Sequence, residues 1–341
     1  MSRVTLKEIA EVCKVHTGTV SRALNNSPKI RAETRRRIQK KAKQMGYERD
    51  PMLRALSLYR SKKRPLDVRS GLAFLTVAPS SFPWQSVKAF ADYFEGASKR
   101  AQELGYHLEE IVLDLEKGGK DATKRILRAR GIEGIIIAPM PQSNSELEFD
   151  WDEFSVVALG FSLRGVKMHR VANHQFRSMV VLTKKLIEKG YKRLALCLPD
   201  SIDERVAYGW SGGFLSVVYA RLGEIPIPIF RGFGTEISGG SKDQFEAYLA
   251  LHKPEVIVGT PNLIQPIQDL GYSIPNDVGF SSPAAVSNGE DIAGIDELST
   301  EIGVAAVDFV TSEVEGRRFG IPSVPRQILI EGVWQEGATL I

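Results

Sequence analysis

Side chains that can read nucleic-acid bases gather in one short segment near the N-terminus, Thr17 to Asn25. An arginine such as Arg22 can donate two hydrogen bonds to one guanine, which discriminates between bases by about 1–3 kcal/mol. Gly18 has no side chain to offer, so we expect base reading to rest mainly on Thr17 and Arg22. The chemistry predicted for this segment is recognition of DNA.

Two short helices are expected to position this segment. Thr5 and Glu8 have the spacing of a capping box, which marks a helix start. Apolar residues recur at helical spacing on both sides of a break at Lys14-Val15: Leu6, Ile9, Ala10 and Cys13 before it, and Val20, Ala23 and Leu24 after it. Two short helices joined by a tight turn form a helix-turn-helix, whose second helix can enter the major groove.

Charge supports DNA binding. Residues 1–64 hold 18 of the 45 Lys and Arg but only 5 of the 41 Asp and Glu, which leaves 27 basic and 36 acidic side chains elsewhere. A basic segment followed by an acidic remainder supplies phosphate attraction where the helix-turn-helix lies. A solvated helix face is the alternative for any single charge run, but an imbalance this concentrated favours DNA binding.

The same region resembles the DNA-binding domain of the lactose-repressor (LacI/GalR) family of bacterial transcription regulators. The resemblance is carried by Val4-Thr5-Leu6, Ile9-Ala10, Val15, Thr19-Val20-Ser21-Arg22, Leu24-Asn25, Thr34-Arg35, Met45-Gly46-Tyr47, Pro51 and Arg54-Ala55-Leu56. It implies a regulator, most simply a repressor, that binds a palindromic operator as a homodimer under control of a small sugar-like effector. It implies DNA contacts from Thr5, His16, Thr17, Gly18, Thr19, Ser21, Arg22, Asn25, Tyr47, Arg54, Ala55 and Leu56.

A third helix is predicted from about Ala32 to Met45, followed by a short helix that Asp50 and Pro51 begin. The short helix is too small to be stable alone in water. The resemblance implies that it is a hinge helix, ordered when two copies meet in the minor groove, with Leu56 wedging a base step open. The alternative is that Leu56 packs on its own domain. We therefore expect a DNA-binding domain at 1–49, a hinge and linker at 50–65, and an effector-binding domain at 66–341.

The remaining residues alternate between apolar runs and amphipathic helical stretches, which predicts an α/β fold with parallel sheets. Strands are expected at 72–78, 111–113, 134–138, 156–159, 194–198, 256–258 and 327–330, and helices at 86–104, 122–129, 175–189, 241–251 and 302–315. The resemblance implies a periplasmic-binding-protein-like domain of two lobes. The first is expected at about 70–161 and 292–326 and the second at about 162–291 and 327–341, with crossovers near Phe161–Ser162, Asn288–Ile292 and Pro325–Gln327.

Ligands of open α/β sheets bind beyond the carboxyl ends of the strands. The segments after the predicted strands hold hydroxyls, amides and aromatic rings suited to a sugar-like effector: Ser80, Ser81, Trp84, Phe161, Arg205, Trp210, Thr260 and Asn262. Three of these residues have an alternative interpretation that involves no ligand. Arg205 could be a surface residue at a helix start, and Trp84 and Trp210 could be core aromatics.

The chain also departs from the family it resembles. Family members commonly carry Asn-Asp after the strand at 256–258 and an Asp after the strand near 278–280, where this chain has Thr260-Pro261 and Ser281-Ser282. The missing Asp normally pairs with sugar hydroxyls, so a sugar acid that pairs with Arg205, and with His174, stands beside a neutral sugar as the expected effector.

Other site types are not indicated. Cys13 and Cys197 lie in apolar patterns, which suggests unpaired buried thiols and neither a disulfide nor a metal site. No motif for catalysis, a metal ion or a cofactor stands out, and no run is long enough to span a membrane. We therefore expect a cytoplasmic, nucleoid-associated regulator and not an enzyme. The competing class is a sugar-binding module or an enzyme on a similar body.

The tail from Glu331 to Ile341 lacks an apolar heptad, so assembly should stop at the dimer.

Overall fold

The structure, a computed structural model, describes residues 4–24, 30–45, 47, 71–77, 84–113, 119–141, 145–223, 227–232, 239–285 and 291–341. The chain divides into two units, residues 1–69 and 70–341, which we call the head and the body and describe one at a time. The expected hinge helix, with Arg54, Ala55 and Leu56, lies outside the described residues.

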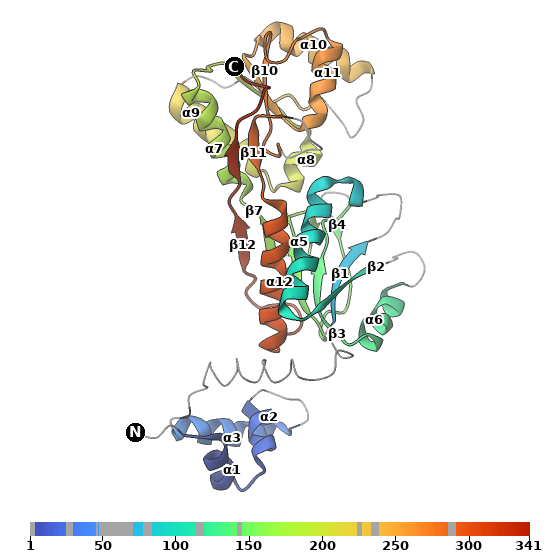
Figure 1. Ribbon diagram of the computed structural model, residues 1–341, viewed down its shortest axis with the longest axis vertical. Coiled ribbons are helices and arrows are strands. Elements are labelled where there is room, and N and C mark those ends of the chain that lie inside the picture. The colour runs from blue at the N-terminus through green and yellow to red at the C-terminus, as the bar shows by residue number, and fades with distance from the viewer. Residues whose placement is uncertain are drawn as a thin grey trace. The chain divides into compact units, whose positions relative to one another are not determined.

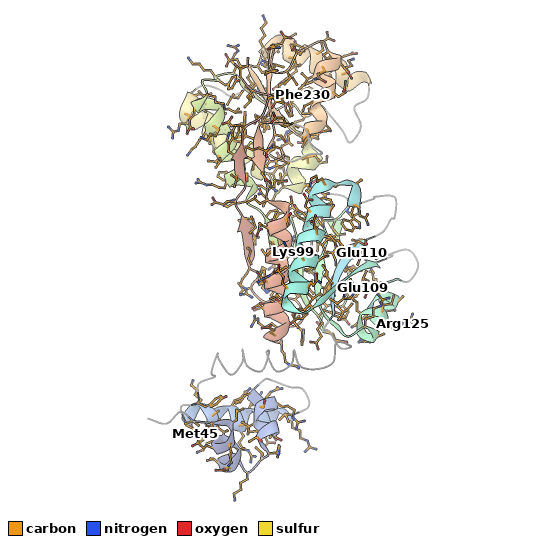
Figure 2. The ribbon with its side chains drawn as sticks, viewed as in Figure 1. Met45, Lys99, Glu109, Glu110, Arg125 and Phe230 are labelled. Atoms are coloured by element: carbon orange, nitrogen blue, oxygen red, sulfur yellow. The ribbon has the colours of Figure 1, made fainter. Side chains whose placement is uncertain are left out.

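The described part of the head contains helices α1 (Leu6–Cys13), α2 (Thr17–Leu24) and α3 (Ala32–Gln44), which confirms the predicted helix-turn-helix (Figure 1). The predicted capping box is present: Thr5 Oγ1 accepts the Glu8 N–H while the Glu8 carboxylate accepts the Thr5 N–H. The three helices bury a shared apolar core: Ile9, Ala10, Cys13, Val20, Ala23, Ile38 and Ala42. Met45, labelled in Figure 2, caps the C-terminal end of α3.

The first lobe of the body is built on a parallel sheet whose described strands run in the order β12-β7-β5-β3-β1-β2. The strands are β1 (Gly71–Val77), β2 (His107–Leu113), β3 (Ile132–Ile137), β5 (Ser155–Leu159), β7 (His169–Asn173) and β12 (Gln327–Ile330). Alternate residues of β1 face opposite sides. Leu72 and Phe74 pack under α5 (Lys88–Leu104) and α12 (Ser299–Glu315), whereas Ala73 and Leu75 pack toward α6 (Gly119–Ala129).

Helices α5 and α12 pack unusually closely, because glycines stand where they meet. A Cβ on Gly96 would lie 2.1 Å from the backbone oxygen of Thr300, and a Cβ on Gly303 would lie 2.1 Å from that of Tyr93. Either side chain would push the helices apart. This contact fixes the start of α12 against α5, beside the lobe boundary.

The second lobe has a smaller parallel sheet in the order β10-β9-β8, made of β8 (Leu194–Cys197), β9 (Val256–Gly259) and β10 (Gly279–Ser281). Helices α7 (Gln175–Glu188) and α9 (Gly209–Leu222) cover one face. Helices α10 (Gly239–His252) and α11 (Ile264–Asp269) lie over the other, where Phe230, labelled in Figure 2, packs on Phe245. Short segments complete the lobes: β4 (Ser145–Glu146), β6 (Leu163–Arg164), α8 (Asp200–Arg205), β11 (Gly294–Asp296) paired with β13 (Val333–Gln335), and the single-turn helices η1 (Trp84–Ser86) and η2 (Pro261–Leu263).

The predicted α/β fold and the predicted strands and helices are confirmed, with bounds shifted by a few residues. The predicted crossovers between the lobes are wrong. The chain crosses between β7 and α7, between β11 and α12, and between β12 and β13, each later than expected (Figure 1). The reason is that β7 and β12 extend the sheet of the first lobe, whereas we had assigned their residues to the second lobe. The tail also holds a further strand, β13, beyond the last one expected.

Both cysteines are buried and free, as predicted, and burial raises the pKa of the Cys197 thiol. Within the described ranges, no helix is long and apolar enough to cross a membrane. In the same ranges, no group of three or more His, Cys, Asp or Glu side chains could hold a metal ion.

Candidate DNA-reading helix and effector site

His16 caps the N-terminus of α2. Its carbonyl oxygen accepts the N–H groups of Thr19 and Val20 at 2.8 and 3.2 Å, and its ring Nδ1 accepts the N–H of Gly18 at 3.1 Å. The first N–H groups of a helix have no partner within the helix, so a side-chain acceptor at this position stabilises the helix start. A hydroxyl or amide side chain usually does this, and here an imidazole does.

Arg22 and His16 lie over Gly18. Arg22 Nε donates to the Gly18 carbonyl oxygen at 3.0 Å, and both Arg22 and His16 are exposed. A Cβ on Gly18 would lie 3.3 Å from His16 Nδ1 and 3.9 Å from Arg22 Nη2. The missing side chain therefore leaves room for two larger ones on the exposed face of α2.

The other predicted DNA-contacting residues surround this face or support it. Thr17, Thr19 and Ser21 on α2 are partly exposed, while Thr5 caps α1 and Tyr47 is half-buried against the core. Asn25, like Arg54, Ala55 and Leu56, lies outside the described residues. Exposed basic side chains line α3: Arg36, Arg37, Lys40 and Lys43.

Arg205 lies where the two lobes of the body meet. It ends α8 in the second lobe, yet its guanidinium donates to the carbonyl oxygens of Met140 at 2.6 Å and Pro141 at 3.3 Å, which follow β3 in the first lobe. Its Cζ lies 5.4 Å from the ring centroid of Phe90 on α5. Burial lowers the pKa of Arg205 from its ordinary value. The structure thus places Arg205 between the lobes, not on an outer surface.

A separate chain of hydrogen bonds joins the second lobe to a crossover. Trp210 Nε1 donates to Gln175 Oε1, and Gln175 Nε2 donates to the Glu297 carboxylate at 3.1 Å. Burial, helped by the charge of Asp296, raises the pKa of Glu297 to about 7. Burial also raises the pKa of Tyr93. The nearby positive charge of Arg205 and a hydrogen bond with Ser299 act in the opposite direction and lower that pKa. Polar groups of both lobes therefore meet at the crossovers.

Asn173 ties the crossovers together. Its Nδ2 donates to the carbonyl oxygens of Glu297 and Ile330, which belong to the other two crossovers, and its Oδ1 accepts from Ser178 Oγ. Beside this point is a cavity of about 400 Å³, a size within the range of small-ligand sites. Both lobes and a crossover line it: Lys88, Ala89, Asp92, Glu95, Ala284, Asp296, Glu297, Leu298, Ser299, Thr300 and Glu301.

The structure does not bring all the predicted effector residues to this place. Trp84 is 9% exposed in the core of the first lobe, and its Nε1 donates to Glu110, labelled in Figure 2, so its ring and N–H are both occupied. Trp210 is likewise a core residue, the alternative given above, and acts on the site only through Gln175. Phe161 is half-buried after β5, and Thr260 bonds to Asn262 at the start of η2. Ser80 and Ser81 lie outside the described residues.

Sequence reasoning missed Tyr93, Gln175 and Glu297. Gln175 was predicted only as the start of a helix, and the crossover was expected about a dozen residues earlier, near Phe161–Ser162. Nothing in the local sequence connects it with Glu297, because the two are 122 residues apart.

Comparison with known proteins gives matches along most of the chain. Residues 5–50 match the family "Bacterial regulatory proteins, lacI family", and residues 72–262 match "Periplasmic binding proteins and sugar binding domain of LacI family". The chain is 26% identical over 193 residues to the HTH-type transcriptional regulator MalR of Streptococcus pneumoniae, and this stretch spans 56% of each protein.

Solved structures share the fold. The transcriptional regulator CelR in complex with cellobiose has a TM-score of 0.57 at 15% identity, with 99% of this chain and 100% of that one covered. The lac repressor dimer bound to operator and the anti-inducer ONPF has a TM-score of 0.55 at 16% identity, with 100% of both chains covered.

Proposed function

Since this chain belongs to the LacI family of bacterial regulatory proteins, we propose that it is a sequence-specific DNA-binding regulator of transcription, most simply a repressor. We further propose that it acts as a homodimer on a palindromic operator in the bacterial cytoplasm, and that a small sugar or sugar acid controls its affinity for DNA. The proposal contains no catalytic step.

The exposed face of α2 is the observation that carries the proposal. His16 stands just before the start of α2 and Arg22 stands out from its last turn, whereas Val20 and Ala23 fix the opposite side of this short helix in the core. The recognition helix of a helix-turn-helix lies in the major groove and reads base edges with exposed side chains of this kind. Each chain offers one such helix, and two copies related by a two-fold axis would read two half-sites of matching symmetry.

The meeting point of the lobes supports control by an effector. Arg205 reaches from the second lobe to carbonyl oxygens of the first, so a ligand that competes for or adds to these bonds would change how the lobes meet. A ligand can shift such an equilibrium only as far as it binds the two arrangements differently.

Selection of sites from random DNA by the full chain tests the proposal. The expected winners are palindromes of about two helical turns of DNA, bound by two copies of the chain. Sequencing of the selected DNA gives the preferred site, and light scattering gives the mass of the complex. Recovery of no common sequence, or of a single unpaired half-site bound by one copy, would contradict it.

A further inference from the structure

Three arginines of the body form no ion pair within 4 Å with a described acid, although Glu146 pairs with Arg164 in strand register. Arg164 on β6, Arg170 on β7 and Arg205 on α8 are each half-buried, and none of them forms an ion pair with a described residue. We call them the arginine cluster. Three other arginines of the body pair with buried carboxylates: Arg318 and Arg326 with Glu313, and Arg231 with Asp203. The cluster differs from these three.

Backbone carbonyl oxygens accept from each arginine of the cluster. Arg170 donates to the carbonyl oxygens of Gly160 and Leu163, and Leu163 directly precedes Arg164. Arg164 Nη2 in turn donates to the carbonyl oxygen of Glu204 at 3.1 Å, and Glu204 directly precedes Arg205. Burial, together with the positive charge of Arg164, lowers the pKa of Arg170. The cluster thus crosses from the segments after β5 in the first lobe to the end of α8 in the second.

Carbonyl oxygens do not neutralise these charges. A guanidinium has five N–H donors and no acceptor, so each of the three retains donors beyond its carbonyl partners. Like charges in a poorly solvated place repel one another unless a counter-charge is present. Arg164 Nε adds an independent sign: it is buried and has no hydrogen-bond partner among the described residues. A buried donor left unpaired is rare in folded proteins, and an ion or ligand bound beside it is one physical explanation.

We propose that the arginine cluster binds an anionic group, a carboxylate or a phosphate, of the effector. This inference rests on the proposed function, because it gives the chemical class of the ligand that acts between the lobes. Planar guanidinium groups bind such anions through paired, charge-assisted hydrogen bonds. An anion here supplies a counter-charge at hydrogen-bonding distance and an acceptor for Arg164 Nε. A neutral sugar supplies neither of these, so the cluster selects a sugar acid or a sugar phosphate over the neutral sugar.

Inorganic phosphate is the first probe. Its binding to the full chain is measured by calorimetry and by the shift in thermal unfolding relative to chloride at equal ionic strength. Arg164→Gln is expected to bind phosphate about tenfold more weakly or worse, because it removes a charge-assisted hydrogen bond donor. Arg128→Gln is the matched control: it removes the same charge from an exposed surface arginine that pairs with Glu153, and phosphate binding should not change.

Arg205→Gln is a second variant of the cluster. It tests the proposal even if Arg164→Gln does not fold. Equal phosphate responses in the wild type, both cluster variants and the control would overturn the proposal. Absence of phosphate binding by the wild type would overturn it as well.

Competition identifies the source of the anion. Displacement of phosphate by D-glucuronate but not D-glucose assigns a carboxylate, and displacement by D-glucose 6-phosphate alone assigns a phosphate. Stronger displacement by D-glucose than by either anion contradicts the inference. DNA binding is measured separately in chloride without any of these ligands. Loss of DNA binding there would refute the proposed function and leave the anion site standing.

Discussion

Arg22 donates from Nε to the carbonyl oxygen of Gly18, one helical turn earlier, at 3.0 Å. This bond fixes the Nε side of the guanidinium against the helix backbone and leaves the donors of the two Nη groups for another acceptor. A pair of Nη donors held in one plane is the geometry that recognises the O6 and N7 acceptors of guanine. The position of Gly18 beneath Arg22 and His16 is therefore part of how α2 presents them.

Arg22→Ala should relax the preference for one base pair in each half-site. The expected loss of discrimination at that pair is about 1–3 kcal/mol, the value of a paired arginine–guanine contact. Affinities for a selected operator and for each single base-pair change in it measure the effect. Arg36→Ala on α3, which also removes an exposed arginine, should weaken all the sequences alike. Uniform weakening by Arg22→Ala would instead mean that Arg22 contacts phosphate.

His16→Ala should destabilise the start of α2 by about 1 kcal/mol, the usual cost of losing an N-cap acceptor. His16→Asn keeps a side-chain acceptor for the Gly18 N–H and should retain most of the stability. Hydrogen exchange of the amides from Gly18 to Val20 in the full chain measures this locally. Equal exchange in both variants and the wild type would show that the imidazole does not act as the cap.

The head could be predicted closely because its signals are local. The capping box of Thr5 and Glu8 and the buried positions Ile9 and Val20 lie within one or two helical turns of each other. Spacing alone therefore indicated the helices and their inner faces. The role of His16 was not predicted, because an imidazole cap depends on a rotamer and not on a residue pattern.

The lobe boundaries could not be predicted in the same way. Strand β7 contains His169, Arg170 and Asn173 and carries no long apolar run, so its place in the first sheet depends on pairing with β5 and β12. The site between the lobes could not be predicted for the same reason, because it too depends on contacts between residues far apart in the sequence. Gln175 meets Glu297 only after the chain has crossed between lobes, and periodicity says nothing of such distant pairs.

Leu56→Ala should weaken binding to the selected operator while leaving binding to unrelated DNA nearly unchanged. Leu56 lies outside the described residues, and this prediction follows from the family's hinge helix, whose leucine wedges a base step at a cost of a few kcal/mol. Binding to unrelated DNA depends on phosphate contacts, and the substitution removes no charge. Operator bending, measured by energy transfer between labelled DNA ends, should fall in parallel. Unaltered bending and affinity would show that Leu56 does not wedge the DNA.

Glu297→Gln should change how the stability of the body depends on pH. Burial raises the pKa of Glu297 to about 7, above its ordinary value of 4.5, so the folded state binds more protons than the unfolded state between these values. The free energy of unfolding therefore falls as pH rises through this window and levels off above it. Glutamine cannot ionise and can still bond to Gln175, so the variant should gain stability over the wild type as pH rises from about 4.5 to about 7.

Urea unfolding followed by tryptophan fluorescence measures this, because all four tryptophans lie in the body. Glu301→Gln is the control, since Glu301 is an exposed carboxylate on the same cavity wall. The groups near Glu297 that also titrate or carry charge are present in both proteins: Lys88, Asp92, Tyr93, Glu95, Arg205 and Asp296. A stability difference that stays constant with pH would show that Glu297 does not titrate in this window.

Arg205→Ala should abolish the effect of the effector on DNA affinity while sparing operator binding in its absence. The substitution removes a guanidinium of the arginine cluster, and with it the bonds that join α8 to Met140 and Pro141. The effector is therefore bound more weakly, and its binding is no longer transmitted through that contact. Coupling between two ligands is reciprocal and typically amounts to about 1–3 kcal/mol. In the wild type, the effector should therefore change the affinity for operator by some factor, and operator should change the affinity for effector by the same factor. In the variant, both factors should approach one. Calorimetry with and without operator measures both factors, and Arg128→Ala, at an exposed arginine in the last turn of α6, serves as the charge control. Retention of full coupling in Arg205→Ala would place the link between the sites elsewhere in the body.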